Sequence, residues 1–171
     1  MRSKNEADEK ETILYSEWVP MSKIVVILII LLVAVLITNT IIISVLEPQE
    51  MVLAISLGGA LSILFLLIGL NFRGLRITLT KNVIKIKFGI FNKKIISLDE
   101  LVSCEVIKAS FGKYYGMGIR LGSDSSWAYI TDFGDAVKLT YQESKLFVFS
   151  TKNYPEICKI LTVLNENLET K

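Results

Sequence analysis

The chain has 171 residues, is 51% hydrophobic, contains no histidine and carries a formal net charge of +2. The missing histidine removes the commonest general base and the commonest metal ligand. The sequence also has no phosphate-binding loop, nucleophile elbow or metal-ligand spacing. We therefore expect a protein that is not an enzyme, with no catalytic residues, no metal and no cofactor.

The two cysteines, Cys104 and Cys158, are far apart and do not form a C-x-x-C motif. This spacing is not that of a disulfide scaffold or a zinc cluster. We expect each cysteine to act as a small buried hydrophobic side chain.

Two apolar runs dominate the first half of the chain, residues 24–46 and 51–70, with Glu47-Pro48-Gln49-Glu50 between them. Neither run contains Asp, Glu, Lys or Arg. About 20 apolar residues form a helix of roughly 30 Å, which crosses the hydrocarbon core of a bilayer. The sequence thus predicts a transmembrane helical hairpin over residues 24–70, anchored in the cell membrane as a two-span protein.

Residues 1–23 precede this hairpin as a polar tail and lead-in. Residues 1–12 are charged without periodicity, so we expect a disordered tail. Tyr15 and Trp18 suit the lipid headgroup layer, and Pro20 suits the start of a helix.

The distribution of Lys and Arg predicts which side of the membrane each part occupies. The connector has neither residue, whereas Lys23 precedes the first run and Arg73 and Arg76 follow the second. Residues 71–171 contain 15 Lys and Arg against 10 Asp and Glu, a net charge of +5. Because positive flanks stay inside, the N-terminus and the domain at 71–171 should face the cytoplasm.

Small and polar residues in the two spans predict how the helices pack. Ala54, Gly58 and Ser62 recur every four residues and share one helix face, where small side chains let backbones approach. Asn39 lies at about the same depth in the first span. We expect it to face the second helix or a neighbouring subunit.

From residue 72 the hydrophobic period changes to two, which is typical of strands. Ile84, Ile86 and Phe88 alternate with Lys85 and Lys87, for example. Strands are predicted at residues 73–79, 83–88, 93–96, 101–108, 117–121, 126–130, 136–141 and 146–150. An amphipathic helix follows from Pro155, with its apolar stripe at Ile157, Ile160, Leu161, Leu164 and Leu168. This order predicts an α+β domain, an antiparallel barrel or sandwich capped by the helix.

Four segments together resemble the bacterial pleckstrin-homology-like (PH-like) domain of small membrane proteins with two N-terminal spans. They are the basic hairpin at 73–96 closing on Ile96-Ser97-Leu98-Asp99-Glu100-Leu101, then Gly116-Met117-Gly118-Ile119-Arg120, then Trp127-Ala128-Tyr129 with Gly134-Asp135-Ala136-Val137, and last residues 147–153 running into Pro155-Glu156. The resemblance implies seven strands in two near-orthogonal sheets capped by a helix. It supplies no catalytic residues.

The first candidate site is the basic hairpin that follows the second span. Residues 73–94 hold seven cations and no acid: Arg73, Arg76, Lys81, Lys85, Lys87, Lys93 and Lys94. Each cation near an anionic bilayer surface contributes about 1 kcal/mol of attraction. The alternative is that these residues only set topology and protect strand edges.

The second candidate is the loop around Phe111, Lys113, Tyr114 and Tyr115, whose aromatic rings could wedge into a bilayer interface or grip a peptide.

We expect a membrane-anchored scaffold or binding module whose domain contacts a protein partner or anionic inner-leaflet lipid, and no nucleic acid. The alternative function is a subunit of a membrane transport or export assembly, in which the helical hairpin makes homo-oligomer contacts.

Overall fold

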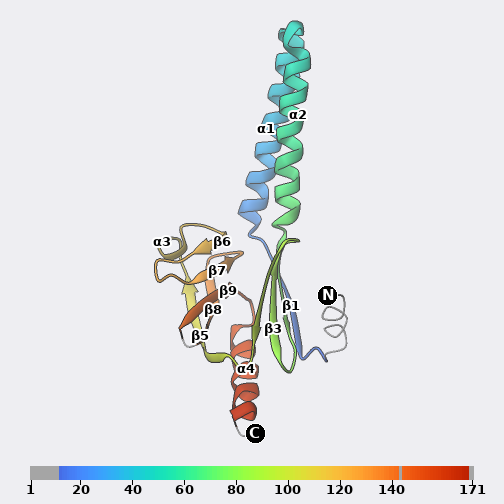
Figure 1. Cartoon of the computed structure of the whole chain (residues 1–171). Coiled ribbons are helices and arrows are strands. Elements are labelled where there is room, and N and C mark those ends of the chain that lie inside the picture. Colours follow the sequence, from blue (N-terminus) through green and yellow to red (C-terminus); the bar gives the residue numbers. More distant parts are fainter. Residues whose placement is uncertain (1–11, 143, 170–171) are drawn as a thin grey trace. The chain divides into compact units, whose positions relative to one another are not determined.

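The computed structural model describes residues 12–142 and 144–169, and the chain forms two units (Figure 1). Residues 21–73 form the helical unit, and the segments before and after them form the sheet unit. The predicted disordered tail lies outside the described residues apart from Thr12.

Two long helices make up the helical unit. Helix α1 (Lys23–Leu46) and helix α2 (Met51–Asn71) are joined through the short 3-10 turn η2 (Pro48–Glu50). Both helices are long and apolar enough to cross a membrane. Large apolar side chains are exposed around both helices, such as Ile24 and Leu46 at the two ends of α1. A helix that is apolar on every side is typical of a lipid environment.

The two helices pack along a strip of small and hydroxyl side chains. A Cβ atom on Gly58 would overlap the Thr40 hydroxyl, so the two backbones approach closely at this level. Ser62, one turn further along α2, is buried and donates a hydrogen bond to the Gly58 carbonyl oxygen at 2.7 Å. Ala54 is partly buried on the same strip. These small residues therefore contact α1 of the same chain.

The first sheet contains four antiparallel strands in the order β1 (Tyr15–Pro20), β2 (Gly74–Leu79), β3 (Val83–Phe88) and β4 (Asn92–Ser97). The predicted helix start at Pro20 was wrong, because residues 15–20 form a strand and Pro20 ends it opposite Gly74. Strand β1 precedes α1 in the sequence, whereas its partner β2 follows α2. A pairing between segments so far apart cannot be predicted from either segment alone.

The second sheet contains β5 (Leu101–Ala109), β6 (Gly118–Leu121), β7 (Trp127–Ile130), β8 (Gly134–Tyr141) and β9 (Lys145–Ser150). Their order is β5-β8-β9-β7-β6, and β7 pairs parallel with β9. The described residues thus form nine strands, one more than the eight ranges predicted and two more than the resemblance implies. The pairing is not wholly antiparallel. The predicted α+β layout holds, with two sheets and the C-terminal helix α4 (Tyr154–Glu169).

Alternation along the strands builds one core from both sheets. Ile84, Ile86 and Phe88 are fully buried on one face of the first sheet, as the sequence predicts. The Phe88 ring lies 5.6 Å from the Tyr129 ring of the second sheet, between ring centres. Helix α4 adds a buried stripe that includes Ile157 and Leu161. The side chain of Leu168 lies outside the described residues.

A carboxylate fixes β1 to the segment before α4. Glu17 accepts hydrogen bonds from the Thr151 hydroxyl at 2.6 Å and from the Lys152 backbone N–H at 3.0 Å. The Tyr15 hydroxyl also donates to Glu17, at 3.0 Å. Charge-assisted bonds of this kind are the stronger class of hydrogen bond. They hold the edge strand of the first sheet to the chain that leaves the second.

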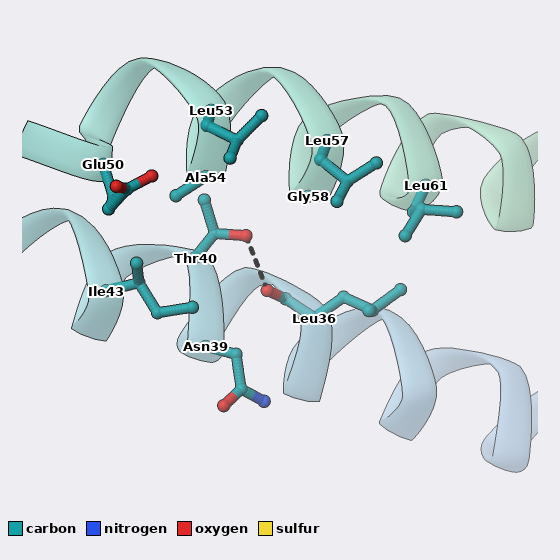
Figure 2. A pocket seen from close by; sticks show the side chains of 10 residues that line it. All are labelled: Leu36, Asn39, Thr40, Ile43, Glu50, Leu53, Ala54, Leu57, Gly58 and Leu61. Carbon is teal, nitrogen blue, oxygen red and sulfur yellow. Dashed lines mark hydrogen bonds between the residues drawn. The ribbon is translucent and has the colours of Figure 1, made fainter.

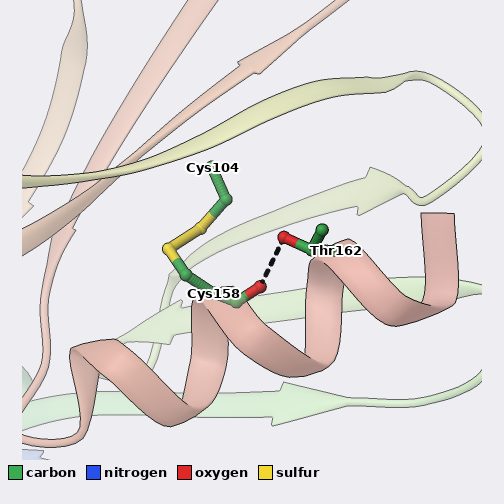
Figure 3. The surroundings of a disulfide bond; sticks show 3 residues. All are labelled: Cys104, Cys158 and Thr162. Carbon is green, nitrogen blue, oxygen red and sulfur yellow. Dashed lines mark hydrogen bonds between the residues drawn. A yellow bond between two sulfur atoms is a disulfide. The ribbon is translucent and has the colours of Figure 1, made fainter. Parts of the chain in front are cut away.

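The cysteines were predicted wrongly, because Cys104 and Cys158 form a disulfide bond (Figure 3). The bond joins β5 to α4 across a sequence separation of 54 residues, with the two Cα atoms 5.6 Å apart. One turn along α4, the Thr162 hydroxyl donates to the Cys158 carbonyl oxygen at 2.9 Å. Spacing along the chain could not predict this pair, because the fold brings a strand and a distant helix together.

Replacing Gly58 with Ala should destabilise the helical hairpin, because the added methyl group forces α1 and α2 apart. Overpacking of this kind typically costs about 1–3 kcal/mol. Gly59 is the matched control, since a Cβ atom there meets nothing within 4 Å. Thermal unfolding of the full chain in detergent should show a lower midpoint for Gly58→Ala and little change for Gly59→Ala. Equal midpoints for the two variants would contradict the described packing.

Replacing Cys104 with Ser should lower the free energy of unfolding of the oxidised protein by about 2–4 kcal/mol, because a disulfide restricts the unfolded chain. Denaturant titrations with and without a reductant measure this loss. The reductant should destabilise the parent protein but not the variant. A parent protein that is insensitive to the reductant would argue against the bond.

Candidate functional site

The basic hairpin becomes the outer face of the first sheet. Side chains on a strand alternate between faces, so the residues between the buried positions point away from the core. Arg76 on β2 pairs with Lys87 on β3, which pairs with Lys93 on β4. These three cations therefore form a row across the sheet, and all three are exposed. Lys85 lies on the same face, two residues before Lys87 on β3.

Trp18 extends this row on β1, where it pairs with Arg76. The Arg76 guanidinium carbon lies 5.7 Å from the centre of the Trp18 ring, a cation–π distance. Gly74 makes room for the ring, because a Cβ atom there would lie 2.7 Å from Trp18 Cζ2. Trp18 keeps 46% of its surface exposed. We call the set Trp18, Arg76, Lys87 and Lys93 the basic row.

The charges of the basic row are not neutralised within the described chain. Among the side chains that the structure describes, ion pairs include Lys113 with Asp124 and Lys138 with Glu105, and none involves Arg76, Lys87 or Lys93. Like charges directly opposite on neighbouring strands are destabilising, by roughly 0.2–1 kcal/mol per pair. An anion placed over the row would remove this repulsion.

The other three predicted cations lie elsewhere. Lys94 points to the opposite face of β4, where its amino group lies 4.8 Å from the centre of the Tyr141 ring. Lys81 is exposed in the turn between β2 and β3. Arg73 precedes β2 and belongs to the helical unit. The sheet therefore gathers Arg76, Lys85, Lys87 and Lys93 from the seven cations of the hairpin.

The aromatic loop is partly used for internal packing. Its first residues form the short helix α3 (Phe111–Tyr114). Tyr114 is fully buried in a small cluster with Ala128 and Val148, on the face of the second sheet opposite the main core. Phe111 and Tyr115 remain exposed, and the Phe111 ring lies edge-on to Phe133 at 6.1 Å.

Lys113 is also held internally. Its amino group lies 2.7 Å from a carboxylate oxygen of Asp124. Burial alone would raise the pKa of Asp124, but hydrogen bonds from Lys113 and Ser126 outweigh it and lower that pKa to about 2. The same ion pair raises the pKa of Lys113. The pair fixes α3 to the turn that joins β6 and β7, so Lys113 is not available as a free anchor.

Asn39 takes a different position from the small residues on α2. It is exposed, and Figure 2 shows its amide pointing away from α2 while Thr40 points toward it. The first alternative for Asn39, contact with the second helix, is therefore not found. The second alternative, contact with a neighbouring subunit, stays a prediction.

Trp18 is the member of the site that sequence reasoning missed. The structure places its side chain on the sheet beside Arg76, which the sequence did not predict, whereas its predicted place in the headgroup layer stays a prediction. A weak signal was present, because Tyr15, Glu17 and Val19 alternate with Ser16 and Trp18. Across the described residues, no three His, Cys, Asp or Glu side chains gather to hold a metal ion.

No family model, curated protein or solved structure matches this chain. The resemblance to PH-like domains therefore stays a prediction that rests on the motifs of the sequence.

Proposed function

We propose that the protein is a membrane-anchored, non-enzymatic binding module whose basic row binds the phosphate groups of anionic lipid headgroups. The observation that carries this proposal is the row itself, three exposed cations without an ion-pair partner in the described chain. Phosphate oxygens are strong acceptors for Arg and Lys, and Arg can bind them through two parallel hydrogen bonds.

Trp18 supports a lipid surface over a soluble anion as the ligand. A tryptophan ring is amphipathic and favours the boundary between headgroups and acyl chains. Here the ring is half exposed and lies beside Arg76, so one patch offers both a cation and an interfacial aromatic side chain. A free phosphate compound would use the cations alone.

The tether also supports this function. Residues 21 and 22 alone separate β1 from α1, and residues 72 and 73 alone separate α2 from β2. If the two helices span a membrane, the sheet unit is tied to that bilayer by two short links. A short tether raises the effective concentration of headgroups around the domain, so weak contacts of about 1 kcal/mol per cation are sufficient.

We further propose that the domain faces the cytoplasm, because Lys23, Arg73 and Arg76 flank the spans while the connector has no cation. The Cys104–Cys158 bond weighs against this location, since disulfides are rare in reducing compartments. The cations close to the ends of the spans support the cytoplasm as the location we propose. In a reducing cytoplasm the two cysteines would then exist mainly as thiols.

Neutralising the basic row should abolish the preference for anionic lipid. The test variant combines Arg76→Gln, Lys87→Gln and Lys93→Gln, and Trp127→Phe leaves Trp18 as the only tryptophan. Full-length protein in nanodiscs is titrated with lipid that carries a nitroxide quencher on either an anionic or a zwitterionic headgroup. The parent should be quenched more strongly by the anionic lipid. Three cations at about 1 kcal/mol each amount to a preference of roughly 100-fold, which the variant should lose.

The matched control replaces three exposed lysines outside the first sheet, Lys108, Lys152 and Lys159, with Gln. It changes the net charge equally and should keep the preference. Added salt should weaken the quenching of the parent, because exposed charges are screened. Equal quenching of the parent by both lipids would reject the proposed function.

The side of the membrane is tested separately with reporters at the C-terminus. A green fluorescent protein fusion should fluoresce, because that reporter matures in the cytoplasm, and an alkaline phosphatase fusion should be inactive, because that enzyme needs an oxidising compartment. An active phosphatase and a dark fluorescent protein would place the domain outside. The basic row would then meet the outer leaflet, and the disulfide would be permanent.

A further inference from the structure

The side-chain amide of Asn39 forms fewer hydrogen bonds than its donors and acceptor allow. One N–H of its amide donates to the Val35 carbonyl oxygen at 2.9 Å, within the same helix. The other N–H and the side-chain carbonyl oxygen have no partner among residues 12–142 and 144–169. By contrast, the hydroxyls of Thr40 and Ser44 each donate to the preceding helical turn and need nothing further.

The position of Asn39 along α1 makes this exposure costly. Helix α1 ends at Leu46, seven residues later, so Asn39 lies about 10 Å inside the end of the helix at 1.5 Å per residue. A span of this length places that level within the hydrocarbon core. Acyl chains offer no hydrogen-bond donor or acceptor there, so a lipid cannot satisfy the amide.

A groove of about 330 Å³ lies beside Asn39, between the two helices (Figure 2). Leu36 and Ile43 line it from α1, and Leu53, Leu57 and Leu61 line it from α2. The charged residue among those that line it is Glu50, which belongs to the connector. The groove can therefore receive the apolar side chains of another membrane helix next to the Asn39 amide.

We propose that the occupant is a second copy of this chain, with the two Asn39 amides hydrogen-bonded to each other across a two-fold axis. In a two-fold interface the same patch faces itself, so a residue near the axis meets its own counterpart. A side-chain amide carries both donors and an acceptor, so two Asn39 side chains satisfy each other with two reciprocal bonds. Asn39 is the only side-chain amide in residues 24–46 and 51–70, so each copy presents one such group at this depth.

The test measures self-association of the full-length chain in liposomes, by Förster transfer between differently labelled copies at increasing dilution in lipid. The parent should dimerise, and Asn39→Leu should weaken dimerisation about 5- to 30-fold, since interhelical polar contacts of about 1–2 kcal/mol are lost. Ile41→Leu is the control. Ile41 is also exposed but lies two residues, or about 200°, around α1, and its substitution should leave the affinity unchanged.

A second measurement does not depend on affinity. In a Cys104→Ser, Cys158→Ser background, an Asn39→Cys variant should form a crosslinked dimer under mild oxidation, whereas an Ile41→Cys variant should not. A parent that is monomeric at every dilution would overturn the proposal. So would an Asn39→Leu variant that dimerises like the parent, or crosslinking that is equal at the two positions.

Discussion

The strict alternation of side chains along β2, β3 and β4 is the constraint on which the rest of the sheet unit depends. The same register that buries Ile84, Ile86 and Phe88 places Lys85 and Lys87 on the outer face. A shift of one residue would bury the cations and expose the core. The charged face is thus held in place by the hydrophobic one, and the row cannot rearrange without unfolding the sheet.

The two faces of the first sheet differ in their effect on stability. The inner face packs against the second sheet, and Glu17 adds charge-assisted bonds that fix the edge strand β1. On the outer face, repulsion between cations on neighbouring strands destabilises the sheet and offsets part of that stability. Such a conflict between local electrostatics and stability supports the proposal that an anion binds this face.

The local parts of this fold could be predicted from the sequence, and the distant ones could not. The two apolar runs indicated α1 and α2 almost to the residue, because span length and composition are local properties. The period of two likewise indicated the β2–β3 hairpin. Strand β1, the parallel pairing of β7 with β9 and the disulfide all join segments far apart in the chain. Only the folded topology brings those partners together.

For the candidate site too, the residue types could be predicted from the sequence, but their arrangement in space could not. The cations of the hairpin stood out in the sequence, but their division between two faces of the sheet needed the register. The loop at 111–115 looked like a surface motif because its residue types suit one, yet the fold buries Tyr114 and ties Lys113 to Asp124. Residue type alone cannot tell an aromatic anchor from a core residue.

Strands β1 and β2 are neighbours in the sheet although the whole helical unit lies between them in the sequence. During synthesis β1 leaves the ribosome first, but its hydrogen-bonding partner appears only after both helices have been made. The first sheet therefore cannot close until the second helix is complete. If the two helices span a membrane, their insertion has to precede the folding of the first sheet. A chain stalled between the two helices would leave β1 as an unpaired edge that can pair with the wrong strand.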